Sequence, residues 1–214
     1  MDKLPNEFIS LINIYTKNIY NDSLIKFWYI LNKQNKFINL ISRKTSFNDG
    51  FILHIIDSLT GLLFSWPENL LYLDIGSGGG LPAIPLKICN PGWRLTLVES
   101  TRKKANFLTE TVSALGLEEV EVANIFLQNP STYEASFDLI TTRALATLSD
   151  TINLAGPLLK TGGFFMSYKG PNGPLELENS QTNLLKNNLK LVDTKEFLLP
   201  VLNIKRILYL FQKD

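Results

Sequence analysis

The chain is poor in the residues on which many kinds of catalysis depend. Its 214 residues include one cysteine and one histidine. A lone cysteine, Cys89, excludes an internal disulfide framework and a cysteine-rich zinc site, and its apolar helical surroundings favour a small buried hydrophobe. A lone histidine, with neither paired carboxylates nor a Ser-His-Asp arrangement, offers little for general acid–base catalysis. No metal site is implied.

The charge balance and the hydrophobic pattern exclude further classes of protein. With 21 Lys and Arg against 20 Asp and Glu, the net charge is +1, so no basic field covers the whole protein. A nucleic-acid partner must then be held by a local patch. No apolar run approaches the length of a transmembrane helix, and the first residues lack the basic and apolar regions of a signal peptide. No exposed apolar patch indicates an oligomer, so we expect a cytoplasmic monomer.

The 45% of residues that are hydrophobic follow two different patterns. Residues 1–66 repeat apolar side chains at helical spacing and predict an N-terminal helical segment. Within it, Ser23 is expected to cap the second helix, residues 46–50 to form a loop and residues 51–63 to form a third helix. Residues 67–214 form the second part, and we expect the two parts to build one compact unit.

From residue 70 onwards, short apolar runs alternate with helical segments. This alternation predicts an α/β fold, with a largely parallel sheet covered by helices on both faces. Residues 161–163 are expected to form a turn, and two strands in succession at the end predict an antiparallel hairpin. The expected strands are residues 71–75, 94–99, 119–123, 137–142, 164–168, 189–199 and 205–212, and the expected helices are residues 81–88, 102–115, 148–159 and 178–188.

The most informative segment follows the first of these strands. Four glycines lie within residues 76–80, directly after the strand and before a helix, and Glu99 ends the next strand. Strand, glycine turn, helix, strand and acid are the plan of a nucleotide-cofactor site at the edge of a parallel sheet. Glycines let the backbone approach a ligand closely, and Glu99 is placed to accept hydrogen bonds from ribose hydroxyls.

The glycine spacing separates two classes of cofactor. A dinucleotide fold has the pattern G-x-G-x-x-G, whose third glycine packs the helix against the strand. Counted from Gly76 or Gly78, that glycine would stand at Leu81 or Ala83, and neither position holds one. Two prolines in the same segment also remove amide donors that would cradle phosphate. The loop therefore favours S-adenosylmethionine, which has no phosphates, over a dinucleotide.

Six segments, in order along the chain, match one family. The chain resembles the bacterial glucose-inhibited division protein B family, which are small-subunit ribosomal RNA guanine-N7 methyltransferases. It departs from the family at Gln34, where tryptophan is usual, at Ala83, where glycine is usual, and at residues 124–128, where a pair containing an acid is usual. The matching segments are N-K-F-I-N-L at 35–40, H-I-I-D-S-L at 54–59, L-D-I-G-S-G-G-G-L-P-A-I-P-L at 73–86, R-K-K-A-N-F-L at 102–108, T-R-A-L-A-T-L at 142–148 and Y-K-G at 168–170.

The resemblance implies a fold, a reaction and a partner. The fold is a Rossmann-like class I methyltransferase sheet behind an N-terminal helical segment. The reaction is methyl transfer from S-adenosylmethionine to N7 of a specific guanine in small-subunit (16S) ribosomal RNA, either naked or in the small ribosomal subunit. The alternative is a methyltransferase of the same fold that acts on a small molecule or a protein. Taken alone, the near-neutral net charge favours this alternative.

The resemblance also implies a set of cofactor-binding residues. The glycine turn and the leucine after it line the cofactor, an acid lies at its ribose, and an apolar pair lies beside the adenine. Because residues 124–128 depart from the family, Asn124 or Gln128 is an alternative contact for the adenine amine. The implied cofactor residues are Gly76, Gly78, Leu81, Glu99, Phe126, Leu127 and Arg143.

The chemistry of guanine N7 sets what else the site needs. N7 already carries an in-plane lone pair, so catalysis can rest on positioning and desolvation without a general base. Arg143 follows a strand at the ligand-binding edge and is expected to position the substrate through guanine O6, a phosphate or the cofactor carboxylate. His54 and Asp57 are expected to be structural, with Asp57 orienting the histidine. The expected RNA contacts, with plain surface cations as the alternative reading, are Lys36, Arg102, Lys103 and Lys169.

Overall fold

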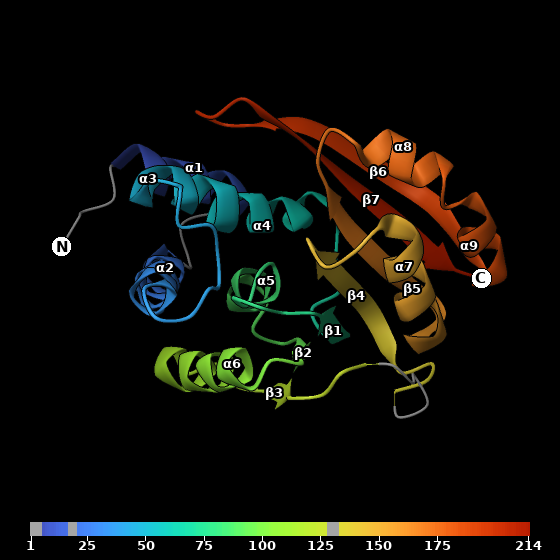
Figure 1. Cartoon of the computed structure of the whole chain (residues 1–214), viewed down its shortest axis with the longest axis horizontal. Coiled ribbons are helices and arrows are strands. Elements are labelled where there is room, and N and C mark those ends of the chain that lie inside the picture. The colour runs from blue at the N-terminus through green and yellow to red at the C-terminus, as the bar shows by residue number, and fades with distance from the viewer. Residues whose placement is uncertain (1–5, 17–20, 128–132) are drawn as a thin grey trace.

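The computed structural model describes residues 6–16, 21–127 and 133–214. The strands form one seven-stranded sheet in the order β3-β2-β1-β4-β5-β7-β6 (Figure 1). Within the described residues, no helix is long and apolar enough to span a membrane. The strands are β1 (Leu71–Ile75), β2 (Arg94–Val98), β3 (Val120–Ala123), β4 (Phe137–Arg143), β5 (Leu159–Lys169), β6 (Leu189–Leu199) and β7 (Ile204–Lys213).

The direction of the strands places the site. Strands β1 to β5 pair in parallel, whereas β7 runs antiparallel to both of its neighbours, β5 and β6. The predicted α/β sheet and its closing hairpin are therefore confirmed. The chain order reverses between β1 and β4, and the carboxyl ends of strands at such a point form the crevice where α/β proteins bind ligands.

Successive side chains along each strand enter two different cores, one on each face of the sheet. Tyr72 and Leu139 belong to the core that includes α5, α6 and the N-terminal helices, whereas Leu73 and Ile140 belong to the core under α7 and α9. Figure 1 shows α7, α8 and α9 together on one side of the sheet. These helices are α5 (Ala83–Cys89), α6 (Arg102–Leu115), α7 (Leu148–Ala155), α8 (Gly173–Glu178) and α9 (Gln181–Lys186), and a 3₁₀ turn, η4 (Gly156–Leu158), follows α7.

The N-terminal segment shares the first of these cores. Ile12, Trp28 and Phe51 are fully or almost fully buried there, beside side chains of the sheet. The last part of the segment is one continuous helical stretch, from residue 47 to residue 63, with a π turn in its middle. The elements are α1 (Asn6–Thr16), α2 (Asn21–Asn35), α3 (Phe47–Phe51), the π turn η1 (Ile52–Ile56), α4 (Asp57–Leu59) and the 3₁₀ turn η2 (Thr60–Leu63).

Two predicted details of the N-terminal segment are wrong. Residues 46–50 are not a loop, because Ser46 caps α3 and its hydroxyl accepts a hydrogen bond from the Asp49 amide at 3.0 Å. Serine is a favoured N-cap residue, so the signal for this helix start was present in the sequence. Ser23 does not cap the second helix, because α2 begins at Asn21 and encloses it.

Two further predictions fail in the C-terminal half. Residues 161–163 belong to β5 rather than to a turn, and Gly162, with φ +81°, lies opposite an irregular stretch of register on β4. Such irregular positions commonly take a glycine with positive φ. The helix expected at residues 178–188 is two short helices, α8 and α9. Pro174 lies in the first turn of α8, a position that suits proline and starts the helix earlier than expected.

Candidate cofactor and acceptor site

The glycine loop between β1 and α5 is held against β2 by its backbone. The amides of Gly76 and Ser77 donate to the Val98 carbonyl at 2.9 and 3.0 Å. Gly76, Gly78 and Gly80 have φ values of +73°, +53° and +80°, a region that other residues rarely adopt. A Cβ at Gly78 would meet no heavy atom closer than the Gly76 carbonyl oxygen, 3.7 Å away. The space beside Gly78 is therefore open to a ligand.

Glu99, at the end of β2, fixes the same loop. One carboxylate oxygen accepts from the Gly78 amide at 2.9 Å, and the other accepts from the Thr101 amide at 2.7 Å. The side chain is buried. Each carboxylate oxygen has two accepting positions, so these two bonds hold Glu99 in place without exhausting it. The expected role of Glu99 at a ribose remains a prediction that this geometry permits.

Asp74, two residues before the glycine loop, is a buried carboxyl group with one unsatisfied oxygen. The Thr141 hydroxyl donates to Oδ1 at 2.5 Å, whereas Oδ2 has no hydrogen-bond partner within the described residues. Burial raises the pKa of Asp74 to about 7, although the hydrogen bonds from Thr141 and Ser77 act in the other direction. A positively charged ligand bound nearby would favour the ionised form.

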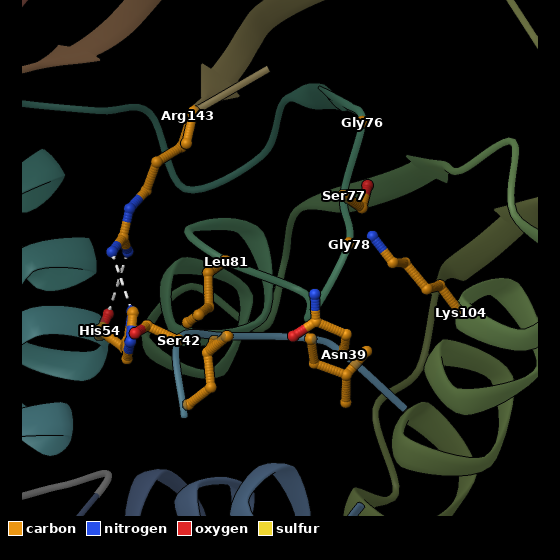
Figure 2. A pocket seen from close by; sticks show the side chains of 12 residues that line it. Asn39, Ser42, His54, Gly76, Ser77, Gly78, Leu81, Lys104 and Arg143 are labelled. Carbon is orange, nitrogen blue, oxygen red and sulfur yellow. Dashed lines mark hydrogen bonds between the residues drawn. The ribbon is translucent and has the colours of Figure 1, made fainter. Parts of the chain in front are cut away.

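The glycine loop forms one wall of a cavity of about 420 Å³, here called the loop cavity. Gly76, Gly78, Leu81 and Arg143, which the sequence placed in one site, all line it (Figure 2). The opposite wall is formed by residues 39–42, which follow α2. Sequence reasoning did not place this wall in the site. It also did not assign Lys104, which shares a helix start with Arg102 and Lys103, to this cavity, which Lys104 lines (Figure 2).

An apolar groove of about 410 Å³ adjoins the other side of Gly76. Phe126 and Leu127 line it together with Leu145, and the Phe126 side chain is 70% exposed. An aromatic ring left exposed beside a glycine loop offers a flat apolar surface to a planar ligand. The sequence-based assignment of Phe126 and Leu127 to an adenine therefore remains a prediction on a surface of suitable shape.

The alternative adenine contacts are placed differently. The Asn124 side-chain amide donates to the carbonyls of Glu99 and Ser100 at 2.8 and 3.0 Å. These bonds fasten the end of β3 to the end of β2, so the amide is engaged in structure. Gln128, the other alternative, lies outside the described residues.

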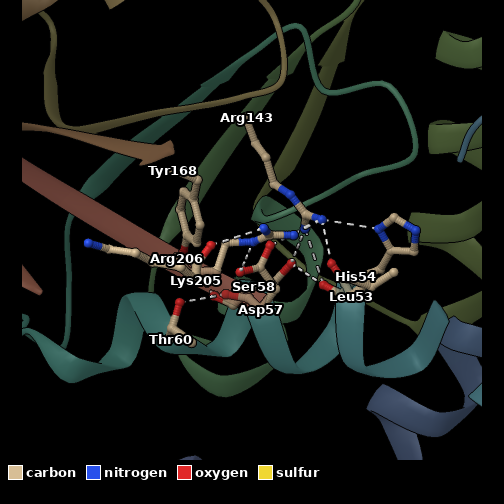
Figure 3. Close-up of polar contacts among 9 residues, drawn as sticks. All are labelled: Leu53, His54, Asp57, Ser58, Thr60, Arg143, Tyr168, Lys205 and Arg206. Carbon is tan, nitrogen blue, oxygen red and sulfur yellow. Dashed lines mark hydrogen bonds and ion pairs between the residues drawn. The ribbon is translucent and has the colours of Figure 1, made fainter. Parts of the chain in front are cut away.

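Arg143, the last residue of β4, directs its guanidinium group into the N-terminal helical stretch. Nη2 donates to the Leu53 carbonyl at 2.6 Å, and Nη1 donates to the His54 carbonyl at 3.3 Å and to Ser58 Oγ at 3.2 Å. Nη2 also lies 3.3 Å from Asp57 Oδ2. Figure 3 shows these contacts converging on one face of the helix. The two carbonyls belong to the π turn, a local irregularity that is frequent at functional sites.

Asp57 joins three distant parts of the chain. Its Oδ2 faces Arg143 on β4, and its Oδ1 lies 3.2 Å from Nε of Arg206 on β7 (Figure 3). The Asp57 side chain is 2% exposed, so the carboxylate that the two pairs share is shielded from water. The expectation that Asp57 orients His54 is wrong, because two guanidinium groups are stronger partners for a buried carboxylate than a neutral imidazole.

His54 is held as a neutral ring. Its Nδ1 lies 3.1 Å from Arg143 Nη2, and because a guanidinium only donates, Nδ1 must accept. Burial, together with the positive charges of Arg143 and Arg206, lowers the pKa of His54 to about 3. His54 lines the loop cavity, and its expected structural role there remains a prediction.

A second cavity, of about 320 Å³, lies on the other side of Arg143 and Ala144. We call it the Glu176 cavity. Ala144 lines both cavities and has φ +52°, a conformation that costs about 1–3 kcal/mol outside glycine. Lys169 from β5, Glu176 from α8 and Arg206 from β7 line the remaining walls.

The four expected RNA-contacting cations fall into two groups. Lys36, Arg102 and Lys103 are exposed on the surface, and the latter two open α6 directly before the cavity-lining Lys104. Lys169 is not on the open surface, because its side chain is only 9% exposed and its ammonium group lies 2.8 Å from Glu176 Oε2. Sequence reasoning missed Glu176 and Arg206, which carry no motif of their own.

Comparison with known proteins identifies the family of this chain and supports its fold. Residues 20–204 match the family model GidB, rRNA small subunit methyltransferase G. The ribosomal RNA small subunit methyltransferase G of Lactobacillus delbrueckii subsp. bulgaricus is 34% identical over 97% of this chain and 89% of that protein. Its counterpart from Mycoplasma capricolum is 35% identical over 89% of this chain and 82% of that protein.

Solved structures resemble this chain in fold at low sequence identity. M. jannaschii TYW2 in complex with AdoMet has a TM-score of 0.55 and 16% identity, and the match covers 71% of this chain and 72% of TYW2. The ribosomal protein L11 methylase of Lactobacillus delbrueckii subsp. bulgaricus has a TM-score of 0.59 and 18% identity, over 76% of this chain and 79% of the methylase. Both likenesses agree with the class I methyltransferase fold that the strand order gives.

Proposed function

The chain belongs to the GidB family of ribosomal RNA small subunit methyltransferases, and from this premise we propose how its site transfers a methyl group from S-adenosylmethionine to guanine N7 in small-subunit (16S) ribosomal RNA. The observation that carries the proposal is a pair of adjoining cavities at the carboxyl edge of the parallel sheet. The glycine loop walls one cavity, and Arg143 and Ala144 separate it from the other.

The residues present fit this cofactor. The space beside Gly78 that a Cβ would fill is open to a ligand. Two residues before the loop, the buried Asp74 carboxyl group has an oxygen without a hydrogen-bond partner within the described residues. Glu99 would hold the ribose, and Phe126 and Leu127 would enclose the adenine in the apolar groove. When bound, S-adenosylmethionine supplies a methyl group on a positively charged sulfur.

The protein's part in the reaction is positioning and exclusion of water. Guanine N7 needs no base, which agrees with the neutral, buried state of His54. Arg143 has its terminal nitrogens committed to the helical stretch, so we assign it to fixing the wall between acceptor and cofactor rather than to proton transfer. Holding two reactants at attack distance in a desolvated site provides a large share of catalysis in such displacements.

We assign RNA binding to a local surface beside the loop cavity. Lys36, Arg102 and Lys103 are exposed there, and Phe37, next to Lys36, is 77% exposed. Cations hold the phosphate backbone, and an exposed aromatic ring is a surface on which an unpaired base stacks. A local patch of this kind suits a protein whose net charge is only +1.

One copy of the chain contains both cavities, so we propose that it acts as a monomer. A ribosomal substrate also makes the cytoplasm its place of action. Neither the charged surface nor the cavities require a second copy of the chain.

The function is tested by incubating the protein with labelled methyl donor and three acceptors: undermethylated small subunits, naked small-subunit RNA and free guanosine. We expect label in the RNA at N7 of one guanine, located by mapping the methylated nucleotide. Label that appears only on free guanosine would exclude a ribosomal acceptor. A comparison of subunits with naked RNA determines which form the enzyme accepts.

A further inference from the structure

The Glu176 cavity contains a charged pair in which the lysine is largely buried and the glutamate side chain is 32% exposed. The Lys169 side chain is only 9% exposed, and its Nζ lies 2.8 Å from Glu176 Oε2 and 3.4 Å from the Ala146 carbonyl. Glu176 Oε2 also accepts from the Leu148 amide at 2.9 Å. Both contacts of the carboxylate fall on Oε2, and no described residue donates a hydrogen bond to Oε1. The pair thus presents an ammonium donor and, next to it, an acceptor oxygen to the cavity.

This order of donor and acceptor complements one edge of guanine. Along its Watson–Crick edge, guanine has the O6 acceptor followed by the N1–H and N2–H₂ donors. An ammonium group matches O6, and a carboxylate oxygen matches the two adjacent N–H groups. Resting on the proposed function, we propose that the Glu176 cavity receives the acceptor guanine and that Lys169 and Glu176 read its O6–N1–N2 edge.

The position of the cavity agrees with this orientation. In a base bound by its Watson–Crick edge, N7 lies on the adjacent edge, beside O6 and away from Glu176. The wall shared with the loop cavity, formed by Arg143 and Ala144, lies where N7 must meet the methyl donor. Alkylation at N7 makes the purine cationic, so a carboxylate bound to its N–H groups interacts more strongly as the charge develops.

The same pair discriminates against adenine. Adenine has an amino donor where guanine has O6 and a bare ring nitrogen where guanine has N1–H. Lys169 would then face a donor, and Glu176 would face a lone pair. A site built to hydrogen-bond a substrate rejects the analogue that lacks the matching groups, and with adenine Lys169 and Glu176 would gain no partner beyond those they already have.

The test combines a change in the protein with a change in the base. Small subunits are reconstituted with guanine or inosine at the mapped target, since inosine lacks only the N2 amino group. Wild type, Glu176→Gln and Glu178→Gln are compared for kcat/KM on both substrates and for S-adenosylmethionine affinity by calorimetry. Glu178 is the matched control, because it lies on α8 but is exposed and outside the cavity.

Wild type and Glu178→Gln should methylate the inosine substrate about 10-fold to 100-fold more slowly than the guanine substrate, the usual effect of losing a hydrogen bond to a charged group. The kcat/KM of Glu176→Gln on the guanine substrate should be lower than that of wild type by a similar factor. Its kcat/KM on the inosine substrate should be only slightly lower than on guanine, and its affinity for S-adenosylmethionine should be unchanged. Three results would overturn this proposal. Wild type could methylate both substrates at equal rates, the effects of the Glu176→Gln change and of inosine could multiply as independent effects do, or a loss of cofactor affinity could account for the whole Glu176→Gln defect. Absence of any wild-type methylation of guanine would instead reject the proposed function itself.

Discussion

Replacing Asp57 by asparagine tests what joins the N-terminal segment to the sheet. The carboxylate is 2% exposed and is paired with Arg143 at 3.3 Å and with Arg206 at 3.2 Å. In Asp57→Asn the two guanidinium groups keep their charges and lose their shared counter-ion. Removing one partner of a buried ion pair costs about 3–5 kcal/mol. Because both arginines retain some contact with water, we expect a loss of about 3 kcal/mol in the free energy of unfolding.

Urea unfolding followed by circular dichroism measures this loss, and a thermal scan should show a midpoint lower by about 6–12 °C for a chain of this size. Glu196→Gln is the matched control, because Glu196 pairs with Lys205 on the surface, where both side chains are more than 40% exposed. Such pairs contribute about 0–1 kcal/mol. The contrast between the two carboxylates separates the buried network from the general effect of removing a charge.

A double-mutant cycle locates the interaction. Arg206→Met alone should cost less than Asp57→Asn, because Asp57 keeps Arg143 as a partner. The combined variant should be more stable than the sum of the two losses predicts, by about 1–3 kcal/mol, as expected for residues in one network. We also expect one cooperative transition, since residues 1–66 and 67–214 share a core. A loss below 1 kcal/mol in Asp57→Asn, or separate unfolding of the N-terminal segment, would refute the reasoning.

Three other predictions concern pH, cofactor and RNA. The pKa of Asp74 is about 7 in the folded chain, against an ordinary 3.8, so its stabilising contribution is complete below pH 4 and is lost as the pH rises to 7. Asp74→Asn should therefore gain up to about 4 kcal/mol over wild type between pH 4 and pH 8 in urea titrations, at about 1.4 kcal/mol per pH unit; a constant difference would contradict this. Gly78→Val should abolish S-adenosylmethionine binding in calorimetry while the circular dichroism spectrum is kept, and unchanged affinity would show that the cofactor lies elsewhere. Replacing Arg102 and Lys103 by glutamine should raise KM for small subunits severalfold, leave kcat unchanged and reduce the salt dependence of binding; an unaltered salt dependence would leave both residues as plain surface cations.

Local patterns predicted the parts of the structure that local interactions determine. The glycine loop and the helix at residues 102–115 were found because their signals lie within a few residues of each other. Gly116 ends that helix with φ +64°, as a glycine at this position usually does. The error at residues 46–50 also has a local cause. Ser46 is a favoured helix cap, but the polar residues around it made the segment resemble a loop.

The residues that sequence reasoning missed are those whose partners are distant. Arg206 lies 149 positions from Asp57, and Glu176 gains its place beside the site only because α8 follows the end of β5. Neither residue stands in a motif, and an isolated charged side chain in a sequence most often belongs to a solvated surface. Only the complete sheet, with β7 inserted between β5 and β6, brings them to the edge where β4 ends.

Arg143 shows how fold and function are joined at this edge. Its terminal nitrogens bind Leu53, His54 and Ser58 in the N-terminal helical stretch, while its backbone ends the strand from which Ala144 turns between the two cavities. A guanidinium group held in this way contributes by fixing distances, because the donors that it gives to the protein are not free for the substrate. The contact between Arg143 Nη2 and His54 Nδ1 also favours a neutral His54 ring. The N-terminal segment is thus a wall of the site as well as a cover for the sheet, and a methyltransferase sheet without it would lack both the Arg143 anchor and the side of the loop cavity formed by residues 39–42.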